Sequence, residues 1–151
     1  MPDRTLETLV GPLSDAVLAE LATVNQALFG FGETAEHLGQ FLGQQRRVHL
    51  VLVRHGGEPV AFKVGFQSEP GTFSSWRGGV LPSARRQGVA RRMLEVQHAW
   101  CREERFAFVQ TQTSADNQPM LILNLQSGFR IVGTRINRAG VLKVELEARL
   151  R

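Results

Sequence analysis

The residues with the clearest chemical potential lie at positions 79–90, where an expected strand ends, a turn follows and a helix begins at a glycine. The first backbone N–H groups of a helix have no partners within it, and its dipole adds partial positive charge at that end. Gly88 and the small Ala90 would let an anion approach this backbone closely. Positive charge is added by Arg85, Arg86, Arg91 and Arg92. The segment predicts a phosphate or pyrophosphate site, and an arginine-rich, solvated helix start is the competing interpretation.

Two other phosphate-binding motifs do not fit the sequence. No Gly-Lys-Ser or Gly-Lys-Thr occurs, which excludes a Walker A loop. Residues 30–35 match the dinucleotide-binding pattern G-x-G-x-x-A, but they follow a helical pattern rather than a strand. We therefore interpret Gly30 and Gly32 as a break between two helices.

Hydrophobic periodicity and capping residues predict the elements that surround the phosphate segment. Helices are expected from the Ser14 N-cap to about Leu28, from the Thr34 N-cap to Leu42, over 87–103, and from Pro119 to Gln126 with Gly128 as the stop. Strands are expected over 6–10, 48–53, 60–66, 72–80, 106–111, 129–136 and 141–146. This order predicts an α/β (α+β) class, with a mixed sheet and helices on its faces. No repeat or linker divides the chain, so we expect one domain over residues 1–151.

The composition is that of a folded globular domain, with 151 residues, 42% hydrophobic and 21% charged. Lys and Arg total 18 against 14 Asp and Glu, and Lys63 and Lys143 are the two lysines. The net charge of +4, without interleaved aromatic residues, disfavours a nucleic-acid partner. A single cysteine, Cys101, excludes a disulfide within the chain. No apolar run approaches the ~20 residues of a membrane span, so we expect a cytoplasmic protein with no membrane partner.

Two separated motifs resemble those of the GNAT superfamily of acyl-CoA-dependent N-acyltransferases. The family hallmark, Q/R-x-x-G-x-G/A at a strand–turn–helix junction, is matched by Arg85, Gly88 and Ala90, and its lead-in by Val80 and Pro82. Downstream, the family has an Asn that opens a helix ending in Gly-Phe eleven residues later, which Asn117 and Gly128-Phe129 match. The two motifs together are far more specific than either alone.

The resemblance implies a mostly antiparallel sheet of about seven strands flanked by about four helices, with acetyl-CoA in a gap between the fourth and fifth strands. Its pyrophosphate would rest on the backbone of Arg86, Gln87, Gly88, Val89 and Ala90. Its pantetheine would pair with the backbone of Gly79, Val80 and Leu81, whose N–H groups would polarise the thioester carbonyl. Gly78-Gly79 matches the family's bulge in the fourth strand. Asn117 would hydrogen-bond the CoA arm.

The sequence departs from the family at the group that protonates the leaving thiolate. Many members carry a Tyr seven residues after the helix-opening Asn, but this position is Asn124 and the chain has no Tyr at all. An amide donates a hydrogen bond but is no proton source near neutral pH. Either the thiolate leaves with hydrogen-bond help from Asn124 or a proton from water, or the protein is a weak or inactive acyltransferase.

The general base and the acceptor pocket are less well defined by the sequence. Glu33 and Glu36 are candidate bases, because they fall in the helical segment that in the family walls the acceptor site. For each one taken singly, a solvated surface charge is the favoured interpretation. Trp76 and Ser75 precede the expected bulge and are candidate acceptor-pocket residues. The histidines show no ligand spacing, so no metal is expected.

Direct acetyl transfer from acetyl-CoA to a primary amine is the leading functional hypothesis. Neither an activated Cys nor an activated Ser is evident, which favours a ternary complex over a covalent enzyme intermediate. The acceptor would be a small-molecule or peptide amine, and a homodimer is left open. The alternative is a catalytically weak or inactive CoA-binding sensor or interaction module, which the amide at Asn124 favours.

Overall fold

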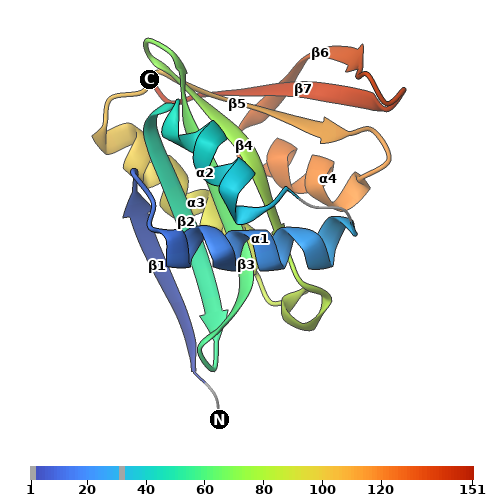
Figure 1. The fold of residues 1–151 in the computed structure, drawn as a ribbon. Coiled ribbons are helices and arrows are strands. Elements are labelled where there is room, and N and C mark those ends of the chain that lie inside the picture. Colours follow the sequence, from blue (N-terminus) through green and yellow to red (C-terminus); the bar gives the residue numbers. More distant parts are fainter. Residues whose placement is uncertain (1–2, 31–32) are drawn as a thin grey trace.

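Seven strands form one sheet in the computed structural model, which describes residues 3–30 and 33–151 (Figure 1). The strands are β1 (Arg4–Val10), β2 (Arg46–His55), β3 (Glu58–Glu69), β4 (Thr72–Val80), β5 (Phe108–Ser114), β6 (Phe129–Ile136) and β7 (Leu142–Arg149). Their order across the sheet is β1-β2-β3-β4-β5-β7-β6. The β4–β5 pair is parallel and the other described pairs are antiparallel. The predicted α/β class with a mixed, mostly antiparallel sheet is confirmed.

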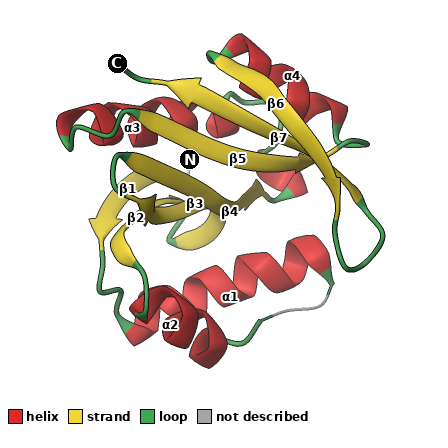
Figure 2. Ribbon diagram, turned by 90° about the horizontal axis from the view of Figure 1, so that it is seen from above, coloured by secondary structure: helices red, strands yellow, loops and turns green. Residues whose placement is uncertain are grey.

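The α-helices of the described residues cover both faces of the sheet (Figure 2). One face carries α1 (Asp15–Phe29) and α2 (Ala35–Gly43), and the other carries α3 (Val89–Glu103) and α4 (Gln118–Gln126). Successive side chains of β2 point to opposite faces of the sheet, so this strand contributes to the core on both faces. Leu50 and Leu52 pack in the core beneath α1 and α2, whereas Val51 and Val53 pack in the core beneath α3.

Side-chain caps start the first two helices where the sequence predicts them. The Ser14 hydroxyl accepts a hydrogen bond from the Val17 N–H at 3.2 Å, and the Thr34 hydroxyl accepts one from the His37 N–H at 3.1 Å. These bonds satisfy N–H groups that have no partner inside the helix. Gly30 closes α1 in the left-handed conformation, with φ of 68°. Gly32, the second glycine of the expected break, lies outside the described residues.

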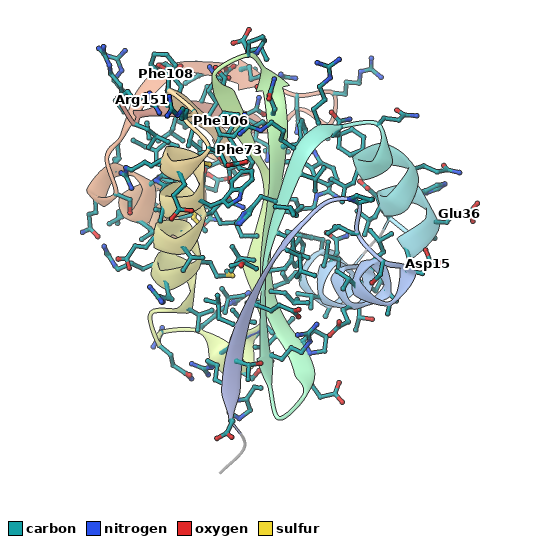
Figure 3. All side chains as sticks on the ribbon, turned by 90° about the vertical axis from the view of Figure 1, so that its left-hand side faces the viewer. Asp15, Glu36, Phe73, Phe106, Phe108 and Arg151 are labelled. Carbon is teal, nitrogen blue, oxygen red and sulfur yellow. The ribbon has the colours of Figure 1, made fainter. Side chains whose placement is uncertain are left out.

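Several predicted boundaries shift by a few residues, and two of the shifts have a clear local cause. The helix α3 begins at Val89 rather than at residue 87, because Arg86 and Gly88 have φ of 61° and 76°, which a right-handed helix does not contain. The strand β5 begins at Phe108, because Phe106 turns into the core. There its ring centroid lies 5.5 Å from that of Phe73 (Figure 3).

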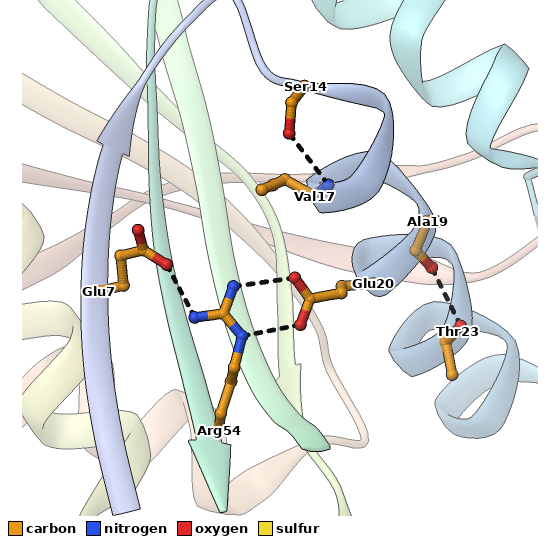
Figure 4. A network of polar contacts seen from close by, with 7 residues as sticks. All are labelled: Glu7, Ser14, Val17, Ala19, Glu20, Thr23 and Arg54. Carbon is orange, nitrogen blue, oxygen red and sulfur yellow. Dashed lines mark hydrogen bonds and ion pairs between the residues drawn. The ribbon is translucent and has the colours of Figure 1, made fainter. Parts of the chain in front are cut away.

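One arginine ties α1 to the edge of the sheet (Figure 4). The Arg54 guanidinium on β2 donates to both carboxylate oxygens of Glu20 on α1, at 2.7 and 2.8 Å. Its remaining nitrogen donates to Glu7 on β1 at 2.7 Å. The hydrogen bonds from Arg54 hold the pKa of the Glu20 carboxyl below its usual value. A two-pronged bond between planar groups is the geometry in which an ion pair stabilises most.

We predict that Glu20→Gln lowers the free energy of unfolding by about 1 kcal/mol at neutral pH, since the pair is only partly buried. The Glu20 pKa is lower in the folded state, so its stabilisation exists above the unfolded-state pKa. It disappears as pH falls through the folded-state pKa. Urea unfolding of both proteins should show curves that converge in acid. Glu58→Gln, at the exposed start of β3, is the matched control and should change stability at neither pH. A deficit that persists in strong acid would contradict the assignment.

Candidate active site

The strands β4 and β5 pair over four residues and then part. Their parallel register runs from Thr72 with Phe108 to Ser75 with Thr111, and no later pair joins them in the described chain. Beyond that point β4 stays with β3, and β5 stays with β7. A cavity of about 320 Å³ lies where they separate. Its wall includes residues of both strands, of the first turn of α3 and of α4, among them Gly79, Val80, Ala90, Thr113 and Asn124.

The irregularity in β4 lies two residues earlier than the sequence predicts. Regular pairing joins Gly78 with Lys63 and Gly79 with Phe62, whereas the register shifts between Ser75 and Arg77. The bulge is therefore at Trp76, and the expectation for Gly78-Gly79 is wrong. Gly78 has a different role, because a Cβ there would lie 2.7 Å from the Phe62 carbonyl oxygen. The missing side chain allows the two strands to approach closely.

The backbone between β4 and α3 forms the turn in which the sequence predicts a phosphate site. A short 3-10 helix over Pro82–Ala84 leads into a turn in which Arg86 and Gly88 are both left-handed. No side chain caps α3, and its first turn holds no acidic residue. The first N–H groups of α3 have no partner inside the helix, and they lie at the positive end of a 15-residue helix. Because a Cβ at Gly88 would enter open space, the backbone is accessible, and the turn fits a phosphate group.

The polar side chains of this turn bind other parts of the protein. The Arg85 guanidinium donates to the Val80 carbonyl oxygen at 2.9 Å. Gln87 accepts a hydrogen bond from Arg4 on β1. Arg91 donates to the Gln126 side chain on α4 at 2.8 Å. Arg85, Gln87 and Arg91 therefore brace the turn, and the backbone offers the direct contacts to an anion.

The pairing of β4 with β3 determines which backbone groups of β4 face the gap between β4 and β5. The Leu81 N–H donates to the Val60 carbonyl oxygen at 2.8 Å, which turns the groups of Leu81 and, two residues before it, Gly79 toward β3. The alternate residues, Gly78 and Val80, point their backbone groups toward the gap. Of the predicted trio Gly79, Val80 and Leu81, it is thus Val80 whose N–H faces the cavity.

Two asparagines on α4 also line the cavity. The Asn117 side-chain oxygen caps the helix by accepting from the Met120 N–H at 3.3 Å, which leaves its amide nitrogen free for another partner. Asn124, only 3% exposed, donates to the Thr113 hydroxyl oxygen at 3.1 Å. The Thr113 hydroxyl keeps its own proton for a further hydrogen bond. The amide at the family's tyrosine position is thereby held against β5.

Trp76 lies on the wall of the cavity next to Ser75, where the sequence expects the acceptor pocket. Its ring stacks on Phe41 of α2, with centroids 4.5 Å apart. The Arg77 guanidinium lies over the same ring at 4.3 Å and forms an ion pair with Glu33 at 2.7 Å. This cluster fixes the cavity wall against the loop before α2.

The two candidate bases are placed differently. Glu33 precedes α2 rather than lying in it, since Thr34 is the helix cap. It reaches the cavity through Arg77, which lines the wall. Glu36 lies in the first turn of α2, and Figure 3 shows its side chain on the outer side of the molecule. Among the described residues, the cavity wall holds neither carboxylate.

Both lysines of the chain line this cavity, which sequence reasoning missed. Lys63 lies in the middle of β3 and is half-buried, and burial lowers its pKa to about 8. Lys143, on β7, donates to the Ser114 hydroxyl at 3.4 Å. The sequence does contain a signal for Lys63, because it is the one charged residue in the apolar run 60–66. A lysine is seldom buried in an interior strand unless it has a function or a partner. Cys101 is buried in the core, and burial raises the pKa of its thiol to about 12.

Comparison with known proteins identifies the family. A model described as the acetyltransferase (GNAT) family matches residues 18–129, and the chain belongs to that family. No curated protein sequence matches the chain. Across the described residues, no helix is long and apolar enough to cross a membrane. The same residues contain no group of three or more His, Cys, Asp or Glu that could hold a metal ion.

Solved structures share the fold at low sequence identity. The ribosomal-protein-S18-alanine N-acetyltransferase from Escherichia coli aligns with a TM-score of 0.78 at 17% identity, over 95% of this chain and 94% of that one. The NatC complex bound to Gag peptide and CoA aligns with a TM-score of 0.77 at 15% identity, over 96% and 99%. The Salmonella typhimurium protein yncA, solved with its cofactor acetyl-CoA, aligns with a TM-score of 0.72 at 12% identity, over 97% and 94%.

We predict that Gly78→Ala lowers the free energy of unfolding by about 1–3 kcal/mol, because the new methyl group would force β3 and β4 apart. Gly133→Ala on β6 is the matched control, since its Cβ would meet nothing within 4 Å, and it should change stability by less than about 1 kcal/mol. Chemical denaturation of the two variants and the unmodified protein measures both effects. Equal stability of the two variants would show that the approach at Gly78 is not tight.

Proposed function

We propose that the protein transfers the acetyl group of acetyl-CoA to a primary amine by direct attack in a ternary complex. The observation that carries this proposal is the continuity of the cavity with the start of α3. Ala90 in the first turn of that helix, Val80 on β4 and Asn124 on α4 all line one space. A ligand with a phosphate at one end and a reactive group at the other would fit this arrangement.

The backbone would hold the cosubstrate at two places. The N–H groups of Arg86, Gln87, Gly88, Val89 and Ala90 would bind its pyrophosphate at the start of α3. The free edge at Gly78 and Val80 would pair with its pantetheine arm, and the Asn117 amide nitrogen would donate to the same arm. When bound, acetyl-CoA supplies an acetyl group activated as a thioester. The Val80 and Gly78 N–H groups, which face away from β3, would donate to its carbonyl oxygen.

Side chains on the opposite side of the gap would receive the amine. Trp76 and Ser75 would line the acceptor site, and Glu33 would act as the base, directly or through water, because its ion pair with Arg77 holds it beside the wall. Peptide or protein amines are acceptors to test first, since the Escherichia coli neighbour is named for a ribosomal protein alanine and the NatC structure holds a peptide. Small-molecule amines are the second class.

We predict that Gly88→Glu weakens CoA binding by at least about 100-fold, because it puts a carboxylate where the pyrophosphate would lie. Isothermal titration calorimetry with CoA measures the effect. Gly57→Glu is the matched control, since Gly57 has a similar φ of 84°, compared with 76° at Gly88, and also faces open space, but lies at the β2–β3 turn. Unchanged CoA affinity in folded Gly88→Glu protein would overturn the cofactor assignment.

We predict that Asn124→Ala lowers turnover by about tenfold while the Kd for CoA changes by less than about threefold. The reason is that Asn124, which is 3% exposed, lines the cavity and bonds Thr113 of β5, whereas the phosphate would bind at the turn before α3. A panel of amines with detection of released CoA thiol first identifies an acceptor, and steady-state kinetics then compare the two proteins. Equal turnover would exclude a catalytic role for Asn124.

A CoA-binding sensor or interaction module is the second candidate. The observation that favours it is the bond from Asn124 to Thr113, which occupies the amide at the position where many family members carry a proton donor. The amine panel separates the two functions. Tight CoA binding without thiol release for any amine, peptides included, would favour the sensor.

A further inference from the structure

The chain has only two lysines, and both line one cavity. Of its 18 basic residues, Lys63 and Lys143 are lysines and the rest are arginines. A guanidinium does not deprotonate in proteins, whereas an ammonium does when it is desolvated. No tyrosine is present to do this work. This placement points to proton chemistry in the cavity.

Lys63 is directed into the cavity by the strand pattern. Its neighbours Phe62 and Val64 pack in the core beneath α1 and α2, so Lys63 points to the opposite face, toward α3. It lies directly across from Gly78 of β4, and a Cβ at Gly78 would be 3.5 Å from the Lys63 Cβ. The absent side chain at Gly78 lets the backbone of β4 approach Lys63 closely. Lys63 is half-buried, with its exposed part on the cavity wall.

The groups that surround Lys63 leave its charge without a counter-ion. Cys101 and His98 on α3 are its near titratable neighbours, and burial lowers the pKa of His98 to about 4, with Lys63 contributing. Arg77 on β4 and Lys143 on β7 share the cavity wall. His49 on β2 is screened by Gln97, which bonds its ring at 3.2 Å. No Asp or Glu lines the cavity within residues 3–30 and 33–151, and no ion pair there involves Lys63.

We propose that Lys63 is the proton donor to the sulfur of the departing CoA, in place of the absent tyrosine; this rests on the proposed function above. The acceptor nitrogen forms a bond to the acetyl carbon, and the carbon–sulfur bond breaks with its electron pair on sulfur. The Lys63 ammonium transfers one proton to that sulfur and becomes a neutral amine. The attacking nitrogen loses one proton to the base or water, and Lys63 regains one from water.

Lys63 suits this step better than Asn124 or Lys143, which also line the wall. The Asn124 amide is not an acid, and its nitrogen is bound to Thr113. Lys143 donates to the Ser114 hydroxyl at the end of β5, so its ammonium already has a hydrogen-bond partner. Lys63 instead faces β4 at Gly78, one of the two residues whose backbone groups point into the gap. Burial places its pKa at about 8, so the ammonium is the main form at neutral pH and the proton is readily given up.

The test titrates the thiol of bound CoA by the ultraviolet absorbance of its thiolate, in the unmodified protein, Lys63→Met and Lys143→Met. An ammonium within hydrogen-bonding distance lowers the pKa of an acid by about 1–3 units. We expect the bound thiol to titrate at least about one pH unit lower in the unmodified protein than in Lys63→Met. Lys143→Met should retain the shift. Because burying an ammonium is costly, Lys63→Met should unfold at the same temperature or higher.

Each outcome decides the proposal. Equal thiol titration in the unmodified protein and Lys63→Met, or loss of the shift in Lys143→Met alone, would overturn it. If Lys63→Met does not fold, Lys63→Gln takes its place in the same titration. An acetyl group found on Lys63 by mass spectrometry after incubation with acetyl-CoA would also overturn it, because the amine would then be a nucleophile. Failure of the unmodified protein to bind CoA would instead overturn the proposed function.

Discussion

The separation of β4 from β5 is the constraint on which the rest of the site depends. Two parallel strands in one sheet would ordinarily continue their ladder, but here each is held by a different neighbour. The close approach at Gly78 keeps β4 on β3, and seven residues of β5 pair with β7. The bulge at Trp76 lies where the strands part and turns that ring against α2. The cavity, its free backbone edge and its side chains all follow from this parting.

Much of the fold could be predicted from the sequence because it depends on interactions between residues that are close along the chain. Ser14 and Thr34 cap helices by bonds to residues three positions away, and the run of Val and Leu over 50–53 in β2 marks a strand buried on both faces. The position of the bulge depends instead on how β4 meets β3. No local signal distinguishes Trp76 from Gly78-Gly79 there. Lys63 was missed for the same reason, since its role depends on strands far apart in sequence.

The chemistry of the site is divided between backbone and side chains. The turn before α3 offers N–H groups for an anion, while its arginine and glutamine side chains brace neighbouring segments. The loss of the family's tyrosine leaves an amide, Asn124, tied to Thr113 on one side of the gap. Lys63 lies on the other side, in a wall without carboxylates. In this protein the proposed proton donor would thus lie on β3, whereas in many family members it lies on the helix that corresponds to α4.

A crystal structure of the CoA complex tests the central claim, that this gap is the cosubstrate site, most directly. We predict that the pyrophosphate contacts the N–H groups around Gly88, that the pantetheine runs along Val80 and Gly78, and that the sulfur lies within hydrogen-bonding distance of the Lys63 ammonium. Density for CoA elsewhere on the protein, with the gap between β4 and β5 unoccupied, would contradict the account.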